Sequence, residues 1–278
     1  MVSHAPKPTI KAKRKIKKVT PRPRQIKTKT KVKTMDKPYG ALAEFYEYFI
    51  ADCDYEKWSQ YLLLEVKKHY SGGSCLDIAC GSGYFTRALK RAGFDVTGVD
   101  ISPEMLEEAG EKTLKEGLRI DYVLQDVVNL KSINKVNFVT CINDGFNYIP
   151  PQKLGKAFKN VAACLKKGGL FFFDISSAYK LENILGNNMF GEDGEEASYM
   201  WFNEFSGGKV TMDLVVFKRE NNGLYSKREE THVQYAHTQE FIGQKLNENG
   251  FKVLKICAHL GQPLKNDSDR IEFIAVKE

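Results

Sequence analysis

Strand-like apolar runs alternate with helix-like segments through the middle of this 278-residue chain. The strand-like runs are 75–79, 96–100, 122–125, 136–142 and 170–175, and helical patterns at about 83–92, 103–116 and 151–166 lie between them. This alternation is typical of a parallel sheet that is covered by helices on both faces. It predicts a doubly wound α/β fold whose strands end at one edge of the sheet, where ligands bind.

The pattern changes after residue 175. Between 198 and 235, three β-rich pieces are separated by the turn sequences SGG and ENNG, which predicts an antiparallel β insert with one face in water. A helix at about 238–249 follows, and strands at 251–258 and 271–276 end the pattern. The last two strands form a hairpin-like end, which predicts an antiparallel edge on a mostly parallel sheet.

Short signals mark the ends of individual helices. Ser102 followed by Pro103 is a typical helix start. The sequence KKGG at 166–169 is expected to end a helix. Two further helices are expected at 41–50 and 55–69, before the first strand.

The positive charge is concentrated at the N-terminus. Residues 1–37 hold 14 of the 42 Lys and Arg residues and one of the 35 Asp and Glu residues. Residues 38–278 therefore carry 28 basic and 34 acidic residues. We expect a disordered basic tail over 1–37, because self-repulsion and the Pro-Arg-Pro-Arg element favour an extended chain, and a folded domain over 38–278.

Three interpretations of the tail stay open. Residues 7–37 could make non-specific contact with nucleic acid or a ribosome by neutralising phosphates, which would depend strongly on salt. The tail could instead be a solubilising or dispensable extension. Met35 could also be the true start of the protein.

The cysteines are scattered, without a C-x-x-C pair, and several lie inside apolar runs. We expect reduced thiols in a cytoplasmic protein. No spacing of His or Cys residues predicts a metal site. No apolar run approaches the length of about 20 residues that a membrane-spanning helix needs, and no signal peptide is indicated.

The turn after the first strand reads LDIACGSG, an acid followed by alternating small residues. Gly81 and Gly83 permit a tight turn before a helix, whose N-terminus carries partial positive charge. A dinucleotide fingerprint would need a third glycine where this chain has Thr86. The match to that fingerprint is therefore incomplete.

This turn, with the acids that end the next two strands and the loop after strand four, resembles class I S-adenosylmethionine-dependent methyltransferases. Residues 38–278 also resemble uncharacterised bacterial methyltransferases of the small-molecule type. The resemblance implies a seven-stranded sheet, S-adenosylmethionine as cofactor, and a β-rich lid at about 189–236 over the acceptor. It implies cofactor binding by Asp77, Ala79, Gly81, Gly83, Asp100, Met105, Asp126 and Val127.

The resemblance also implies roles for several of these residues. Asp100 would accept hydrogen bonds from the ribose hydroxyls, Met105 would contact the adenine face, and Asp126 would lie near the adenine amine. Structural interpretations stand beside these roles. Asp77 could be a purely structural acid, Met105 a core residue and Asp126 a turn acid. Ser102 already fills the capping role that Asp100 could otherwise take.

The methyl acceptor is predicted only by class. The loop NDGFNYIPP lacks the Asn/Asp-Pro-Pro-aromatic order typical of enzymes that methylate base nitrogens, and its prolines are expected to open the next helix. Our candidates for acceptor contacts are Tyr39, Asn143, Asn147, Tyr148 and His237, each of which could instead be a packing or turn residue. No residue is assigned as a general base, because His237 precedes a helix that Thr238 is expected to cap.

Three hypotheses follow from the sequence. The first is a methyltransferase that acts on a small molecule. The second is a methyltransferase that acts on RNA or the ribosome and docks through its tail. The third is a non-catalytic cofactor-binding module.

Overall fold

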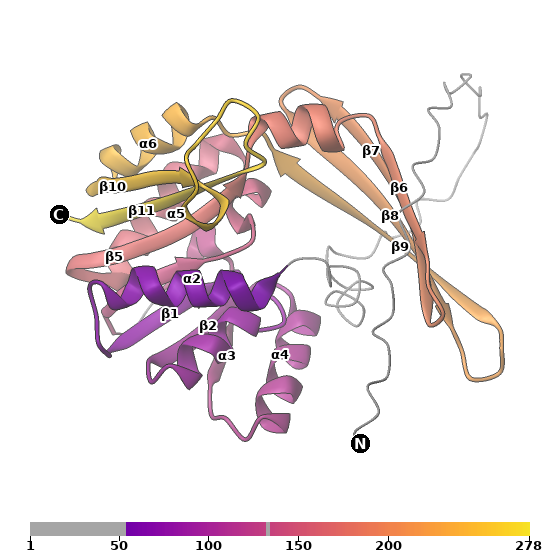
Figure 1. The fold of residues 1–278 in the computed structure, drawn as a ribbon, viewed down its shortest axis with the longest axis horizontal. Coiled ribbons are helices and arrows are strands. Elements are labelled where there is room, and N and C mark those ends of the chain that lie inside the picture. Colours follow the sequence, from indigo (N-terminus) through magenta and orange to yellow (C-terminus); the bar gives the residue numbers. More distant parts are fainter. Residues whose placement is uncertain (1–53, 132–133) are drawn as a thin grey trace, which may run out of the picture. The chain divides into compact units, whose positions relative to one another are not determined.

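A computed structural model of the chain describes residues 54–131 and 134–278. The expected tail over 1–37, the expected helix at 41–50, Tyr39 and Cys53 lie outside the described residues. In the described part, seven strands form one sheet in the order β10-β11-β5-β4-β1-β2-β3, and four strands form a second sheet in the order β6-β7-β8-β9 (Figure 1). The predicted α/β fold with an antiparallel insert after strand five is confirmed.

The first five strands of the large sheet are parallel and carry the predicted apolar runs. They are β1 (Ser74–Ile78), β2 (Asp95–Asp100), β3 (Asp121–Leu124), β4 (Val136–Cys141) and β5 (Leu165–Ser176). β1 lies between β2 and β4, with Leu76 paired to Thr97 on one side and to Val139 on the other. The sequence order reverses beside β1, and ligands of doubly wound folds bind at such a reversal.

The chain closes with β10 (Phe251–Ala258) and β11 (Arg270–Lys277). β11 is antiparallel to both β10 and β5. The predicted hairpin-like end is present, and its reversed strand lies one place in from the edge. Arg270, the first residue of β11, is thereby brought beside Ser176, the last residue of β5.

Helices cover both faces of the large sheet. α2 (Tyr55–Lys67) and α3 (Tyr84–Arg91) bury Trp58, Leu62 and Leu89 against one face. α5 (Pro151–Cys164) and α6 (Gln239–Glu248) pack on the other face with a cluster of phenylalanines. Figure 1 shows α2 crossing in front of the strands and α6 beside β10. α4 (Pro103–Lys115) contacts β2 and β3.

The predicted helix caps are present. Ser102 accepts a hydrogen bond from the backbone N–H of Met105 at 3.2 Å, and Pro103 is the first residue of α4. Thr238 accepts one from the backbone N–H of Phe241 at 3.2 Å, at the start of α6. Such caps satisfy backbone donors that the first helical turn leaves without partners.

The KKGG sequence does not end a helix, and this prediction was wrong. α5 ends at Cys164, and the next residue, Leu165, is fully buried and already paired with Val136 of β4. The register then shifts, so 166–169 form an irregular part of β5. Lys277 donates hydrogen bonds to the carbonyl oxygens of Ala162 and Leu165 at 2.6 and 2.9 Å, which satisfies this helix end without a glycine cap.

The antiparallel insert is a sheet of long strands, which we call the lid sheet. Its strands are β6 (Met189–Asp193), β7 (Ala197–Ser206), β8 (Lys209–Arg219) and β9 (Tyr225–Tyr235). A short π-helical segment, η4 (Lys180–Leu185), connects it to β5, and Leu181 of this segment packs with Val210 and Met212 of β8. The buried side chains of β8 alternate with more exposed ones, so one face of the lid sheet is covered.

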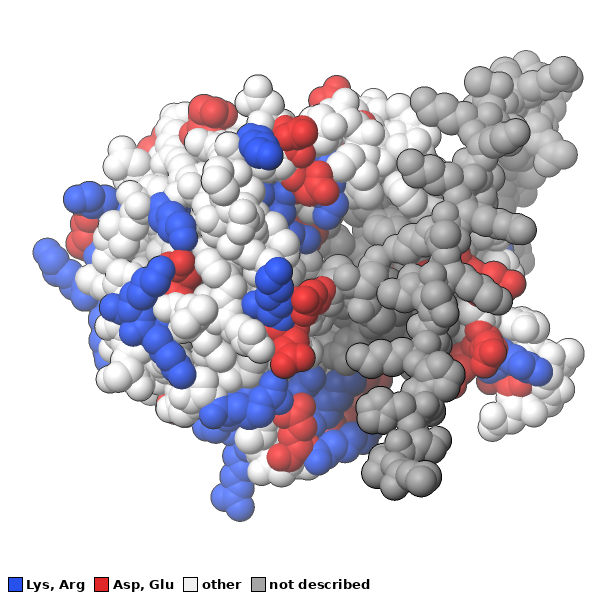
Figure 2. Space-filling view, viewed as in Figure 1, with Lys and Arg blue, Asp and Glu red and all other residues white. Residues whose placement is uncertain are grey.

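Basic and acidic side chains are interspersed on the face of the described residues that Figure 2 shows. The positive charge of the whole chain is contributed mainly by residues 1–37, which hold 14 basic residues and one acid. On the side viewed, the described residues therefore show a mixed charge pattern without a long basic face.

Replacing Gly83 tests the packing of the turn into α3. Gly83 has a left-handed φ of 76°, and a Cβ there would lie 2.6 Å from the hydroxyl oxygen of Tyr122, which Thr113 holds at 2.8 Å. Backbone strain of about 1–2 kcal/mol and overpacking of about 1–3 kcal/mol both apply. We expect Gly83→Ala to lower the free energy of unfolding in urea by about 2–5 kcal/mol.

Gly93→Ala is the matched control. Gly93 also has a positive φ, of 93°, and nothing lies within 4 Å of a Cβ built on it. Gly93→Ala is expected to lower the free energy of unfolding by about 1–2 kcal/mol, because only the backbone strain applies. Equal losses in the two variants would contradict the close packing of Gly83 against Tyr122.

Candidate functional site

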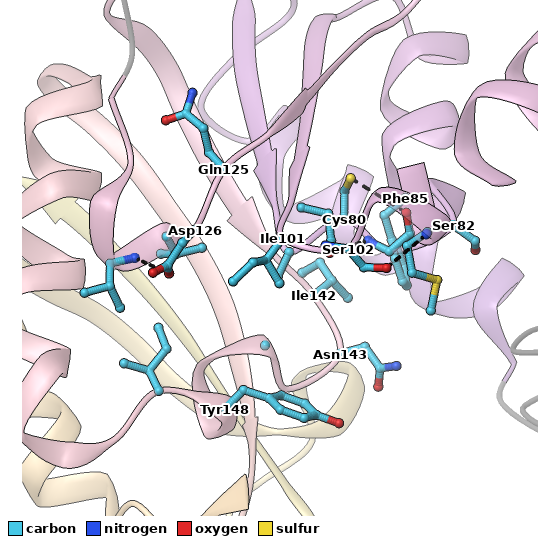
Figure 3. A pocket seen from close by; sticks show the side chains of 18 of the residues that line it. Cys80, Ser82, Phe85, Ile101, Ser102, Gln125, Asp126, Ile142, Asn143 and Tyr148 are labelled. Atoms are coloured by element: carbon cyan, nitrogen blue, oxygen red, sulfur yellow. Dashed lines mark hydrogen bonds between the residues drawn. The ribbon is translucent and has the colours of Figure 1, made fainter. Parts of the chain in front are cut away.

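A cavity of about 480 Å³ opens at the carboxyl ends of the parallel strands. This volume lies within the range of roughly 300–1,000 Å³ that small-molecule sites occupy. The lining residues come from the turn after β1, the start of α4, the segment after β3, and the loop after β4. In Figure 3, Ile101, Ser102 and Cys80 lie along one side of the cavity, and Asn143 and Tyr148 lie along the other.

In the turn after β1, every second residue from 79 to 83 has a left-handed backbone conformation. Ala79, Gly81 and Gly83 have φ values of 51°, 53° and 76°. Ala79 is not a glycine, and it takes the left-handed conformation at a cost of about 1–2 kcal/mol. Ala79 and Gly81 line the cavity, whereas Gly83 caps α3 and packs against Tyr122.

Asp100, at the end of β2, joins this turn to the start of α4. Its Oδ2 accepts a hydrogen bond from the backbone N–H of Gly81 at 2.8 Å, and its Oδ1 accepts one from that of Ser102 at 2.9 Å. The side chain lines the cavity although the residue is only 7% exposed. Burial raises the pKa of Asp100, and the backbone donors of Ser102 and Gly81 oppose that rise. Each oxygen of a carboxylate can accept further hydrogen bonds.

Asp77 lies beneath the turn and does not line the cavity. Its two oxygens accept hydrogen bonds from Thr86 Oγ1 at 2.6 Å and from Thr140 Oγ1 at 2.8 Å. Asp77 thus ties β1 to α3 and β4. Thr86 is the residue that breaks the dinucleotide fingerprint, and the structure gives it a role as a partner of Asp77. Burial raises the pKa of Asp77 to about 6, although the two threonine hydroxyls lower it in part.

The segment after β3 forms one end of the cavity. Asp126 accepts hydrogen bonds from the backbone N–H of Val128 at 2.8 Å and from Asn129 Nδ2 at 3.0 Å, so it caps the short 3₁₀ helix η2 (Val127–Asn129). Asp126 and Val127 both line the cavity. The hydrogen bonds of Asp126 are those of a turn acid. The residue also lies at the cavity, where a ligand could reach it.

Ile101 is a lining residue that sequence reasoning missed. It lies between Asp100 and Ser102, lines the cavity and is 66% exposed. Met105 also lines the cavity but is 2% exposed and packs in the core. The signal in the sequence was an isoleucine directly after a strand-ending acid, at a position where a helix is about to begin.

The predicted acceptor residues separate into two groups. Asn143 and Tyr148 line the cavity. Asn147 is fully buried and bridges the backbones of Ser176 and Tyr235, with all three hydrogen bonds at 2.9–3.0 Å. His237 is 2% exposed and its Nε2 lies 3.0 Å from the carbonyl oxygen of Ile149. Asn147 and His237 therefore act as packing residues, and burial lowers the pKa of His237.

An ionic cluster holds the loop after β4 in place. Asp174, at the end of β5, accepts hydrogen bonds from the backbone N–H groups of Asn143 and Asp144 at 2.7 and 3.0 Å. Arg270 forms ion pairs with both Asp144 and Asp174 and lies over the ring of Trp58 at 4.7 Å. Burial alone would raise the pKa of Asp144, but the charge of Arg270 holds that pKa below its ordinary value. Asn143 and Asp144 keep positive φ values of 73° and 55° in this cluster.

The lid sheet contributes polar side chains that sequence reasoning did not single out. Gln234 of β9 donates a hydrogen bond to Asp144 Oδ2 at 2.5 Å. His232 Nδ1 lies 3.2 Å from the hydroxyl of Tyr148, and its Nε2 lies 3.8 Å from Glu230 Oε1. The available signal was the alternation of Glu230, His232 and Gln234, which places all three on one face of a strand.

The described residues contain no group of three or more His, Cys, Asp or Glu side chains that could hold a metal ion. The five cysteines in 54–131 and 134–278 are free thiols, and four of them are buried. None of the helices in the described ranges is long and apolar enough to cross a membrane.

Comparisons with known proteins converge on one family. A family model described as a methyltransferase domain matches residues 75–169. A "Putative methyltransferase" of Geobacillus sp. (strain WCH70) is 30% identical over 245 residues, which cover 86% of this chain and 99% of the relative. A ubiquinone biosynthesis O-methyltransferase of Coxiella burnetii (strain RSA 493) is 36% identical over 210 residues, 74% of each chain.

A solved structure agrees with these relatives. The S-adenosylmethionine-dependent methyltransferase from Clostridium acetobutylicum ATCC 824 is 34% identical, with a TM-score of 0.79. The match covers 86% of this chain and 98% of that protein. Fold and sequence are therefore similar over nearly the whole length of the solved chain.

The pH dependence of stability tests the burial of Asp77. Because the pKa of Asp77 is raised to about 6 in the folded state, its contribution to stability is fully present below the unfolded pKa and is lost as pH rises through 6. This loss is expected to reach about 3 kcal/mol. Asp77→Asn stays neutral, so its unfolding free energy should fall less than that of the wild type between pH of about 4 and about 7.

Urea denaturation across this pH range measures the difference between the two proteins. Asp95→Asn, at the exposed start of β2, is the control for removing one carboxylate from the same region. Parallel pH profiles for the wild type and Asp77→Asn would contradict a raised pKa at Asp77.

Proposed function

The chain belongs to the class I S-adenosylmethionine-dependent methyltransferases, and we propose that it transfers a methyl group to a small-molecule acceptor. The observation that carries this proposal is the single continuous cavity that reaches from Asp126 at the end of β3 to Tyr148 after β4. A site of this size, mostly enclosed by side chains of one domain, suits a cofactor and a small acceptor side by side.

The side chains along the cavity fit the adenosine part of S-adenosylmethionine. Asp100 would accept hydrogen bonds from the ribose hydroxyls, because its oxygens retain acceptor capacity beyond the two backbone donors. Ile101 and Val127 would contact the adenine, and the exposed side chain of Ile101 gains burial in that contact. Asp126 would receive the adenine amine.

The bound cofactor supplies a methyl group on a positively charged sulfur. The task of the chain is then to position the acceptor, exclude water and, where needed, remove a proton. Tyr55, Tyr84 and Phe85 add aromatic surface to the cavity wall near the turn after β1. Aromatic faces attract cations, so these rings suit the sulfonium end of the cofactor.

The acceptor would bind between the loop after β4 and the lid sheet. Asn147 bridges the backbones of β5 and β9, and Gln234 of β9 is hydrogen-bonded to Asp144 of the loop, so the lid sheet is tied to the cavity wall. Cys141 is a poor nucleophile here, since burial raises the pKa of its thiol well above the ordinary value. The similarity to an O-methyltransferase of ubiquinone biosynthesis supports an acceptor that is methylated on oxygen.

An RNA acceptor is the second candidate. The 14 basic residues among residues 1–37 favour contact with phosphates. The described residues add no matching surface on the face in Figure 2, where basic and acidic side chains are interspersed. A base-specific interface would need side chains that reach base edges, and we assign the basic tail no base specificity.

Calorimetry with S-adenosylmethionine tests the ribose contact. Asp100→Asn removes the negative charge and part of the acceptor capacity, so we expect the dissociation constant to rise about 10- to 100-fold. Asp95→Asn, at the opposite end of β2, should bind as the wild type does. An unchanged dissociation constant for Asp100→Asn would show that the ribose is held elsewhere.

A screen with radiolabelled cofactor distinguishes the two acceptor classes. The full chain and a chain that lacks residues 1–34 are incubated with a metabolite extract and with total RNA. We expect both proteins to label the same small molecule at equal rates. Label in RNA that is lost with residues 1–34 would contradict the small-molecule proposal and favour the second candidate.

A further inference from the structure

The covered face of the lid sheet changes character at β9. On β8 this face carries Val210, Met212 and Leu214, each at most 5% exposed. Their direct partners on β9 are Gln234, His232 and Glu230. These three polar residues are 4%, 4% and 1% exposed. Burying a carboxylate and an imidazole is costly compared with continuing the apolar face, so stability alone does not explain them.

Two of these side chains lead to the cavity. Tyr148, from the 3₁₀ helix η3 (Gly145–Tyr148), lines the cavity, and its hydroxyl lies 3.2 Å from His232 Nδ1. The other ring nitrogen of His232 lies 3.8 Å from Glu230 Oε1, which is an ion-pair separation rather than a hydrogen bond. A series of side-chain contacts, from Tyr148 to His232 to Glu230, therefore leads from the cavity wall into the covered face of the lid sheet.

The third of these polar residues on β9, Gln234, belongs to a different hydrogen-bond network. Gln234 is hydrogen-bonded to Asp144, which is ion-paired with Arg270. Asp144 is thus committed to holding the loop after β4, and its pKa is kept low by Arg270 against the effect of burial. Asp144 is the carboxylate beside Gln234, and Glu230 is the carboxylate beside His232.

We propose that Tyr148, His232 and Glu230 form a proton relay that makes the acceptor nucleophilic. Tyr148 Oη takes the proton of an acceptor hydroxyl or ammonium group while its own proton passes to His232 Nδ1, and Glu230 stabilises the resulting imidazolium. The electron pair left on the acceptor atom bonds to the transferred methyl carbon, and the pair of the carbon–sulfur bond stays on sulfur. His232 later returns the proton to water through Tyr148.

The relay specifies the acceptor class, and it rests on the proposed function. Alcohols, phenols and amines carry a proton that must leave during methylation, so they gain from a positioned base, typically by about 10²–10⁴-fold. An acceptor that is already an anion gains nothing from such a relay. Tyr148 contacts the acceptor, whereas His232 and Glu230 act through it and are positioning residues.

The tautomer of His232 tests the relay without any acceptor. The full chain is labelled with ¹⁵N-histidine, and the His232 signals are assigned by their loss in His232→Gln. In the neutral ring we expect the proton on Nε2, toward Glu230, and an unprotonated Nδ1 whose ¹⁵N signal shifts in Tyr148→Phe. A proton on Nδ1 would overturn the relay, because that nitrogen could not then accept one.

Kinetics with the acceptor from the radiolabel screen give a second test. Tyr148→Phe and His232→Gln should each lower kcat about 100-fold with little change in KM, and Glu230→Gln should lower it less. Thr231→Val is the matched control, because Thr231 lies on the opposite face of β9 and donates a hydrogen bond to Asp213 at 2.6 Å. Calorimetry with S-adenosylhomocysteine checks that each variant still binds the cofactor product.

The outcomes separate the relay from the function on which it rests. Full activity in Tyr148→Phe or His232→Gln would overturn the relay and leave the methyltransferase intact. A wild-type chain that labels no acceptor at all would contradict the proposed function, and the tautomer measurement would still decide whether Tyr148 and His232 can exchange a proton.

Discussion

The carboxylate of Asp100 joins the two turns on which the cavity depends. By accepting from the backbone N–H groups of Gly81 and Ser102, it fixes the glycine turn after β1 against the first residues of α4. These turns come from neighbouring strands, so one side chain sets the width of the crevice between them. The buried carboxylate is stabilised by charge-assisted hydrogen bonds, which are among the stronger ones in proteins. The same side chain is the one that we propose accepts hydrogen bonds from the ribose hydroxyls.

A second, separate network positions the other side of the cavity. Arg270 is brought to the end of β5 because β11 runs antiparallel beside it, and there it neutralises Asp144 and Asp174. The loop after β4 is thereby held with Asn143 and Asp144 in the left-handed region, which Asn and Asp adopt more readily than other non-glycine residues. The reversed strand of this fold thus contributes to the site as well as to the sheet, and Gln234 extends the network to the lid sheet.

Much of the fold followed from the sequence because its signals are local. Alternating apolar runs, the Ser102 and Thr238 caps, and the acids that end strands each act within a few residues, and the structure contains them. The KKGG prediction was wrong because burial of Leu165 and a lysine from the far end of the chain end that helix. Such long-range contacts cannot be predicted from the sequence near the residues that they affect.

The site was only partly predictable for the same reason. Asp100 and Asp126 lie at the cavity as the strand pattern predicts, but the pattern could not show that Asp77 faces two threonines beneath the turn. The alternation in the insert predicted one face in water, and only tertiary packing determines that the polar His232 and Glu230 lie on the covered face. The account as a whole is tested most directly by a crystal structure of the chain with S-adenosylhomocysteine. It predicts ribose hydroxyls within hydrogen-bond distance of Asp100 and an adenine ring against Ile101. A ligand bound elsewhere, or a ribose that does not meet Asp100, would contradict it.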